Sequence, residues 1–198
     1  MESSHDEPAT AASVQPALHP RLIVVTGQGG SGKTTLAHRL AGAVGCPAIC
    51  RDEIKEGMVH AHGPGFQAAV GDPLTRRAYP LFFGVLRLLL DGGVTVVAEA
   101  AFQHQLWERG LSSLSAAPHV RVVRCWTGHE EMLRRRHQRL AEMPTRVAHA
   151  DRGTLITEGP QPWDAIHIDA PTLDVDTTDG YTPDLDQIAA FANTRTAG

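Results

Sequence analysis

The stretch "RLIVVTGQGGSGKTT", residues 21–35, decides the fold, because an apolar run leads into a glycine-rich turn and then into a helix start. Gly27, Gly32, Lys33 and Thr34 fill the spacing G-x-x-x-x-G-K-[ST] without a gap. The spacing marks a phosphate site only where a buried strand precedes it and a helix follows. "RLIVVTG" predicts such a strand and "TTLAHRLAGAV" an amphipathic helix. The stretch therefore predicts a P-loop; a glycine-rich turn that binds nothing is the alternative.

Each residue type in this turn has a physical role toward a nucleotide. Glycines let successive backbone N–H groups point at an anion, and the helix that begins near Lys33 adds its positive dipole end. Lys33 can reach the β- and γ-phosphates, and the Thr34 hydroxyl can ligate Mg²⁺. We therefore expect ATP and Mg²⁺ as cofactors. The expected nucleotide-binding residues are Gly27, Gly29, Gly30, Ser31, Gly32, Lys33, Thr34 and Thr35.

Composition narrows the class of protein. A chain of 198 residues with 42% hydrophobic residues can bury one α/β core, and its net charge of −4 argues against nucleic acid as a partner. Three cysteines without a C-x-x-C pair are typical of a reduced, cytoplasmic protein. The apolar stretch "PLFFGVLRLLL" is too short to span a membrane, so no membrane partner is expected.

We expect a disordered leader over residues 1–20, one domain over 21–192 and a flexible tail over 193–198.

The rest of the chain predicts strands that alternate with helices. Further strands are expected at 46–50, 94–100, 120–126 and 172–177, and helices at 66–90 with a break near 71–73, 105–114, 129–143 and 184–194. Such alternation is typical of a parallel sheet with helices on both faces. Ligands of these sheets bind beyond the carboxyl ends of the strands. Residues that directly follow a strand are therefore candidates for chemistry.

Two carboxylates stand at such strand ends. Asp52 follows the second strand and Glu99 closes the third, so both are expected to face the P-loop. One could hold Mg²⁺ through water, and the other could orient a hydroxyl and accept its proton. Asp52 could instead cap a helix over residues 53–57, since Asp is a favoured N-cap. Glu99 ends a buried run, where a carboxylate is costly unless it is used or paired.

Arginines crowd the predicted helix 129–143. Like charges this close repel one another, so a counter-anion would stabilise them. As a cluster after the fourth strand, they are typical of a mobile lid that clamps transferring phosphates. Arg135, Arg136 and Arg139 are the expected catalytic lid residues, and a solvated helix face is the alternative for any one of them.

The ordered segments "GQGGSGKTT", "CRDEIKEG", "VVAEAAF", "EEMLRRRHQR" and "DVDTTDGYTPDLDQI" resemble the small P-loop kinases of the AAA_33 type. That group includes chloramphenicol phosphotransferase-like enzymes, gluconate- and shikimate-kinase-like folds and the kinase domain of polynucleotide kinase. The resemblance covers about residues 21–192. It implies a P-loop NTPase fold of class α/β, with a five-stranded parallel sheet of order 2-3-1-4-5, helices on both faces and a helical lid.

The resemblance also implies roles for the two carboxylates. In such kinases the Asp after the second strand acts as catalytic base, and the matching position is Asp52. The third strand of the relatives often ends in Asp, whereas this chain has Glu99, which leaves the division of labour open. We expect Glu99 and Thr34 to serve the metal.

The function implied by the resemblance is an ATP-dependent O-phosphotransferase acting on a small hydroxylated molecule. These folds usually place the acceptor in the segment that here runs from Lys55 to Leu90, which mixes apolar, aromatic and cationic residues. The acceptor residues expected are Lys55, Arg76, Arg77, Tyr79 and Phe102. A chloramphenicol-like or nucleoside antibiotic, phosphorylated as a resistance mechanism, is the acceptor that the family favours. Arg76, Arg77 and Tyr79 could instead form an exposed helix face.

Other functions stay open at this stage. A nucleoside, nucleotide or sugar kinase of metabolism has the same motifs, and so does a non-catalytic ATP-binding regulator, and the chain could form a homodimer. A guanine-reading N-K-x-D or T-K-x-D segment requires a lysine, and the only lysines, Lys33 and Lys55, are in neither context. A GTP-dependent switch is therefore excluded.

Overall fold

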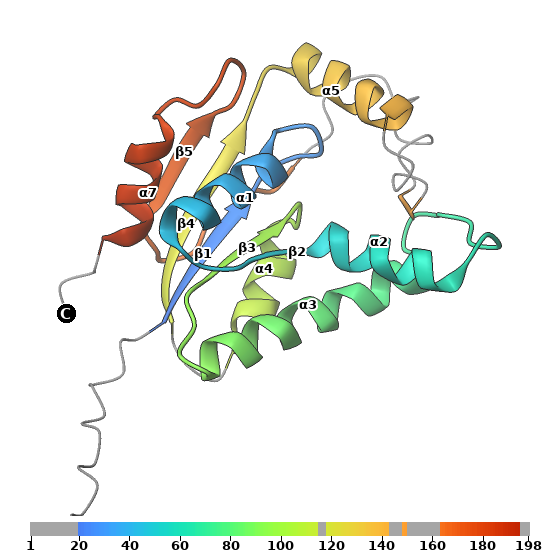
Figure 1. The fold of residues 1–198 in the computed structure, drawn as a ribbon, viewed down its shortest axis with the longest axis horizontal. Coiled ribbons are helices and arrows are strands. Elements are labelled where there is room, and N and C mark those ends of the chain that lie inside the picture. The colour runs from blue at the N-terminus through green and yellow to red at the C-terminus, as the bar shows by residue number, and fades with distance from the viewer. Residues whose placement is uncertain (1–19, 115–117, 143–147, 150–162, 195–198) are drawn as a thin grey trace, which may run out of the picture.

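A computed structural model describes residues 20–114, 118–142, 148–149 and 163–194. Most of the predicted leader (1–20) and tail (193–198) lies outside these ranges. The five strands are β1 (Arg21–Thr26), β2 (Ala48–Cys50), β3 (Val96–Ala100), β4 (His119–Trp126) and β5 (Thr172–Asp176). They pair in parallel in the order β2-β3-β1-β4-β5, which confirms the predicted order 2-3-1-4-5 (Figure 1).

Helices cover both faces of this sheet, as predicted. The helices are α1 (Lys33–Val44), α2 (Arg51–His62), α3 (Pro73–Asp91), α4 (His104–Leu111), α5 (His129–Glu142) and α7 (Leu185–Asn193). Successive residues of β1 point to opposite faces: Leu22 and Val24 pack with α3 and α4, while Ile23 and Val25 pack with α1 and α7. Burial on both faces explains why the strand is apolar throughout. In Figure 1, α5 lies apart from both layers, beyond the carboxyl ends of the strands.

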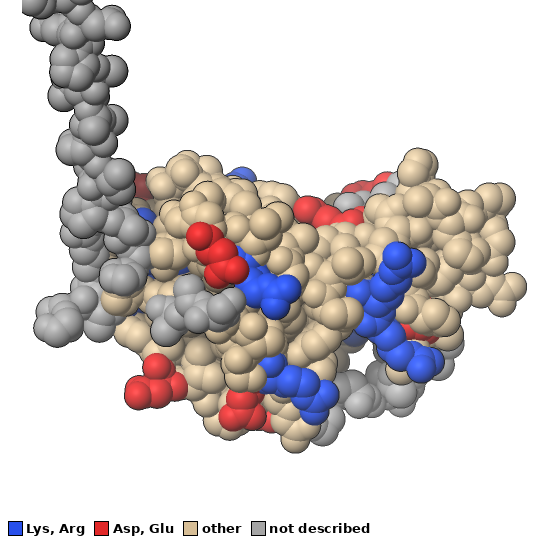
Figure 2. Space-filling view, turned by 90° about the horizontal axis from the view of Figure 1, so that it is seen from below, with Lys and Arg blue, Asp and Glu red and all other residues tan. Residues whose placement is uncertain are grey.

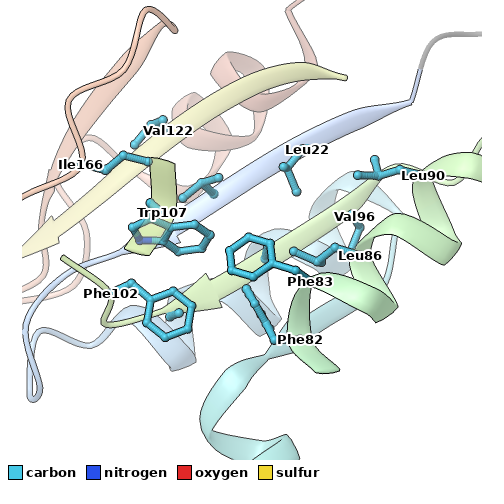
Figure 3. Packing of buried hydrophobic residues seen from close by; sticks show 13 residues of the cluster. Leu22, Phe82, Phe83, Leu86, Leu90, Val96, Phe102, Trp107, Val122 and Ile166 are labelled. Atoms are coloured by element: carbon cyan, nitrogen blue, oxygen red, sulfur yellow. The ribbon is translucent and has the colours of Figure 1, made fainter. Parts of the chain in front are cut away.

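An aromatic cluster fills the face under α3 and α4. Phe82, Phe83, Phe102 and Trp107 meet at ring-centroid distances of 5.1–6.1 Å (Figure 3). The indole Nε1 of Trp107 donates a hydrogen bond to Thr26 Oγ1 over 3.2 Å. Thr26 is the last residue of β1, so the aromatic cluster anchors the point at which the chain enters the P-loop.

Gly110 of α4 is the glycine on which this cluster depends most. A methyl group at this position would overlap the ring of Phe83. We expect Gly110→Ala to lower the free energy of unfolding by about 1–3 kcal/mol, as overpacking does in well-packed cores. Gly84→Ala in α3 is the matched control, since nothing lies within 4 Å of its added methyl group and alanine favours helix. Urea unfolding of both variants would test this, and equal midpoints would contradict it.

The helix predicted at 66–90 is wrong over its first turns. The structure has no helix at residues 66–72, and α3 begins at Pro73. Asp72 is the N-cap, because its side chain accepts from the backbone N–H of Thr75, and proline at the first helical position favours the same start. The predicted break at 71–73 is therefore the beginning of the helix.

The surface carries mixed charges on the face seen in Figure 2. Acidic and basic side chains lie interspersed there. Across the part of the chain that the structure describes, no helix combines the length and apolar character needed to span a bilayer. Cys46, Cys50 and Cys125 are all free.

Candidate active site

The glycine-rich turn has the conformation that the motif requires. Gly27, Gly30 and Gly32 have φ values of +154°, +97° and +75°. A Cβ at Gly30 would lie 2.6 Å from the carbonyl oxygen of Met132 in α5, and one at Gly32 would lie 3.2 Å from Arg135 Nη1. Only glycine therefore suits positions 30 and 32, because both the backbone angles and the close approach of α5 disfavour a side chain there.

Lys33 is the first residue of α1 and is 4% exposed. Its Nζ lies 3.5 Å from Oε1 of Glu99, which closes β3 and is 1% exposed. Burial raises the pKa of Glu99 above its ordinary value; the charge of Lys33 opposes this rise and that of Asp52 adds to it. Lys33 also lines a cavity together with Gly29 and Gly30, so the pair brings a cation to the glycine turn.

Asp52 lies in the first turn of α2, and Arg51 Nη1 donates to its Oδ1 over 3.0 Å. The N-cap of this helix is Cys50, so Asp52 is not the cap. Burial acts to raise the pKa of Asp52, but the charges of His149, Lys33 and Arg51 together outweigh it and hold the pKa at about 2. Asp52 is therefore ionised throughout the neutral range.

Two cavities adjoin at these residues. The larger, about 510 Å³, is lined by Gly32, Lys33, Thr34, Thr35 and Arg39 of the P-loop and α1, Asp52, Glu53 and Glu56 of α2, Arg135, Gln138, Arg139 and Glu142 of α5, and Thr177, Gly180 and Tyr181. The smaller, about 210 Å³, is lined by Gly29, Gly30, Lys33, Asp52, Ala101, Arg136, Arg139 and His149. Lys33, Asp52 and Arg139 border both cavities. A phosphate beside Lys33 would therefore be accessible from both cavities.

The α5 arginines divide into two kinds. Arg135 donates through Nη1 to Thr177 Oγ1 (3.1 Å) and through Nη2 to the carbonyls of Thr177 and Thr178, so it ties α5 to the turn after β5. Arg136 and Arg139 line the smaller cavity together with the P-loop glycines. These two are the better placed to contact a phosphate.

We expect Arg136→Ala and Arg139→Ala each to lower phosphotransfer turnover by ~10-fold or more, the value of one or two charge-assisted hydrogen bonds. Arg134→Ala is the matched control on the same helix, because Arg134 is exposed and pairs with Glu131. Steady-state kinetics of the three variants at saturating ATP would test this. Unchanged turnover in all three would make α5 an ordinary solvated helix.

The residues predicted to contact the acceptor lie outside the linings of the two cavities. Lys55 is buried in an ion pair with Asp72 of 2.7 Å, and Phe102 belongs to the aromatic cluster. Tyr79 packs against that cluster and donates to the carbonyl of Leu106, while Arg76 and Arg77 are exposed. Within the described part of the chain, neither cavity has any of these five residues in its lining. Their contact with an acceptor stays a prediction.

Other residues reach the site without having been singled out from the sequence. Thr177 directly follows β5, and its hydroxyl donates to the carbonyl of Ser31 over 2.8 Å. The rule that ligands bind beyond strand ends could have found it, and it could also have found Ala101 after β3. The guanidinium of Arg39 lies 5.7 Å from the ring centroid of Tyr181, and no local pattern pointed to that pair.

The residues present fit a nucleotide and its metal. The glycine cradle leaves room for phosphate oxygens where a Cβ would clash. Among the described residues, Ser31 Oγ and Glu99 Oε2 are buried without a hydrogen-bond partner, so both oxygens can serve a bound group. Thr34 lies in the first turn of α1, at the wall of the larger cavity. Oxygen ligands of this kind suit Mg²⁺.

Comparisons with known proteins agree with this architecture. The family model AAA_33, an AAA domain, matches residues 22–155. The chain is similar to a candidate kinase from Chloroflexus aurantiacus J-10-fl (24% identity, 91% of this chain, 100% of that chain, TM-score 0.76). It is also similar to a sugar kinase from Janibacter sp. HTCC2649, with 18% identity over 87% of this chain and 94% of that chain and a TM-score of 0.58. A third similar structure is the Mycobacterium tuberculosis APS kinase in complex with AMPPNP and APS, with 18% identity over 88% of this chain and 95% of that chain and a TM-score of 0.57. A search of curated proteins finds no match.

Proposed function

Because this chain belongs to the AAA_33 family, we propose that it is an ATP-dependent phosphotransferase that moves the γ-phosphoryl group to a hydroxyl of a small molecule. One observation carries the proposal: two adjoining cavities share Lys33, Asp52 and Arg139. Phosphoryl transfer needs a donor and an acceptor on opposite sides of the transferred group. A protein that only binds ATP has no need of the second cavity.

We assign the nucleotide to the larger cavity and the acceptor hydroxyl to the smaller. The larger cavity has the volume of a small-molecule site, and Thr177, Gly180 and Tyr181 of the segment after β5 form part of its lining. The smaller cavity lies against the P-loop glycines and Ala101, at the end of β3. Asp52 stands between them. In-line attack from the smaller cavity would bring the hydroxyl past this carboxylate.

The chain's own residues then have distinct roles. Backbone N–H groups of the glycine turn and the ammonium of Lys33 hold the phosphates. Mg²⁺, when bound by Thr34 and through water by Glu99, would neutralise charge that develops on the phosphoryl oxygens. Asp52, which is ionised because its pKa is held at about 2, orients the acceptor hydroxyl and accepts its proton late in the loose transition state. Arg136 and Arg139 clamp the transferring group, and Arg135 holds α5 in place.

The chemical class of the acceptor is a narrower proposal. A chloramphenicol-like or nucleoside antibiotic is supported by the resemblance to chloramphenicol phosphotransferase-like enzymes. A sugar or nucleoside is the second class, because a sugar kinase is among the structural neighbours. Either class carries the hydroxyl that the reaction needs.

The test is a phosphotransfer screen with the intact chain, Mg·ATP and a panel of antibiotics, sugars and nucleosides. The expected result is ADP release together with the mass gain of one phosphoryl group on one acceptor. The Lys33→Ala variant supplies the blank. ATP binding without ADP formation for any acceptor would overturn the proposal in favour of a non-catalytic ATP-binding regulator.

A further inference from the structure

We infer a second metal site, for Zn²⁺, formed by His38 of α1, Cys50 at the end of β2 and Glu53 of α2. Among the residues that the structure describes, one group brings three His, Cys, Asp or Glu ligand atoms within 4.8 Å of one another, and it is this one. The three come from different elements. None of them is required by the P-loop motif.

The geometry is close to that of a zinc site. His38 Nε2 lies 2.6 Å from Glu53 Oε1 and 3.7 Å from Cys50 Sγ. Tetrahedral zinc with bonds of about 2.0–2.3 Å holds its ligand atoms roughly 3.3–3.7 Å apart. The Cys–His distance already fits, and the His–Glu distance must open by less than ~1 Å. That opening is accessible, because the His38 and Glu53 side chains are 51% and 50% exposed.

The chemistry of the three ligands selects the metal. A thiolate with an imidazole and a carboxylate is a set that suits Zn²⁺ and leaves a fourth position for water, whereas Mg²⁺ prefers oxygen ligands alone. On binding, the zinc–sulfur bond replaces the S–H bond of Cys50, and the proton leaves to solvent. Cys50 is 2% exposed, so the metal would enter from the side of His38 and Glu53.

The position of the site ties it to the catalytic segment. Cys50 and Glu53 flank Asp52 along the chain, and His38 lies one turn beyond Thr34 on α1. A metal bound to all three would cross-link α1 to the junction of β2 and α2. We therefore expect zinc to stabilise the fold and to fix the segment that carries Asp52.

The experiment uses the full chain without affinity tag, stripped of metal with a chelator and free of nucleotide. Titration with Co²⁺ should give thiolate-to-cobalt charge-transfer absorption that saturates at one ion per chain, and Zn²⁺ should displace it. Zn²⁺ should also raise the melting temperature. No charge-transfer absorption would overturn the inference. The measurement does not depend on phosphotransfer, so its failure would leave the proposed function standing.

Variants assign the ligands. Cys50→Ala should abolish the absorption, whereas Cys46→Ala, the control thiol, should keep it. His38→Gln should weaken zinc binding by at least ~10-fold, since even indirect partners of a metal are worth that much. His60→Gln, an exposed histidine of α2, is its control. His38 is exposed, so this variant tests the site even if Cys50→Ala does not fold. Absorption retained in Cys50→Ala, or equal zinc affinity in His38→Gln and His60→Gln, would overturn the site.

Discussion

Replacing Lys33 by alanine is expected to lower phosphotransfer turnover by ~10³-fold or more, because the variant loses the buried cation that we propose stabilises the transferred phosphoryl group. Lys33 borders both cavities and is almost fully buried, so water cannot replace its charge well. The measurement is turnover at saturating Mg·ATP and acceptor. Near wild-type turnover in a folded Lys33→Ala chain would contradict the P-loop assignment.

The same substitution should also change how the stability of the fold depends on pH. Lys33 lowers the pKa of Glu99, so its removal should raise that pKa further above the ordinary value of 4.5. The folded variant then binds a proton more tightly than the unfolded chain. Its stability should be retained below pH 4.5 and lost as the pH rises toward the raised value of folded Glu99. Urea unfolding should therefore show that the free energy of unfolding decreases more between acid and neutral pH in the variant than in the wild type. Turnover of the variant should be measured at a pH where it is folded.

Asp52→Asn is expected to lower turnover by ~10²-fold or more while ATP affinity is retained, which is the usual scale for loss of a general base. Asparagine keeps the size and one hydrogen-bonding oxygen but loses the charge and the proton affinity. Among the two carboxylates, Asp52 is the one that lines both cavities and is 31% exposed, so an acceptor can touch it. Turnover and ATP binding, measured separately, would test this.

Glu99→Gln is the matched comparison. Glu99 lines neither cavity among the described residues, and its unpartnered Oε2 fits a role toward a metal-bound water. We expect its loss of turnover to be partly restored by raising the Mg²⁺ concentration. Full activity in Asp52→Asn, with Glu99→Gln inactive at every Mg²⁺ concentration, would reverse the two assignments.

Features set by local physics could be predicted from the sequence. Gly27, Gly30 and Gly32 occupy backbone conformations that other residues avoid, so the glycine spacing predicts the turn without knowledge of tertiary contacts. Apolar runs marked the strands because the sheet is buried on both faces. The positions of Asp52 and Glu99 followed from the parallel sheet, whose carboxyl ends form one edge. The helix start at Pro73 differs from the prediction, because Asp72 caps the helix and proline is favoured at its first position, so this pair begins a helix rather than interrupting one.

Tertiary structure alone decided which partners these residues have. The sequence could determine a P-loop, an alternating α/β chain and an arginine-rich helix, since each depends on neighbours within a few positions. It could not show that Arg135 donates a hydrogen bond to Thr177, that Lys55 forms an ion pair with Asp72, or that His38 contacts Cys50. Such pairs depend on distances between separate elements, which the packing of helices on the sheet sets. For the same reason, only the folded chain shows that Arg136 and Arg139 line the smaller cavity while Arg135 binds the turn after β5.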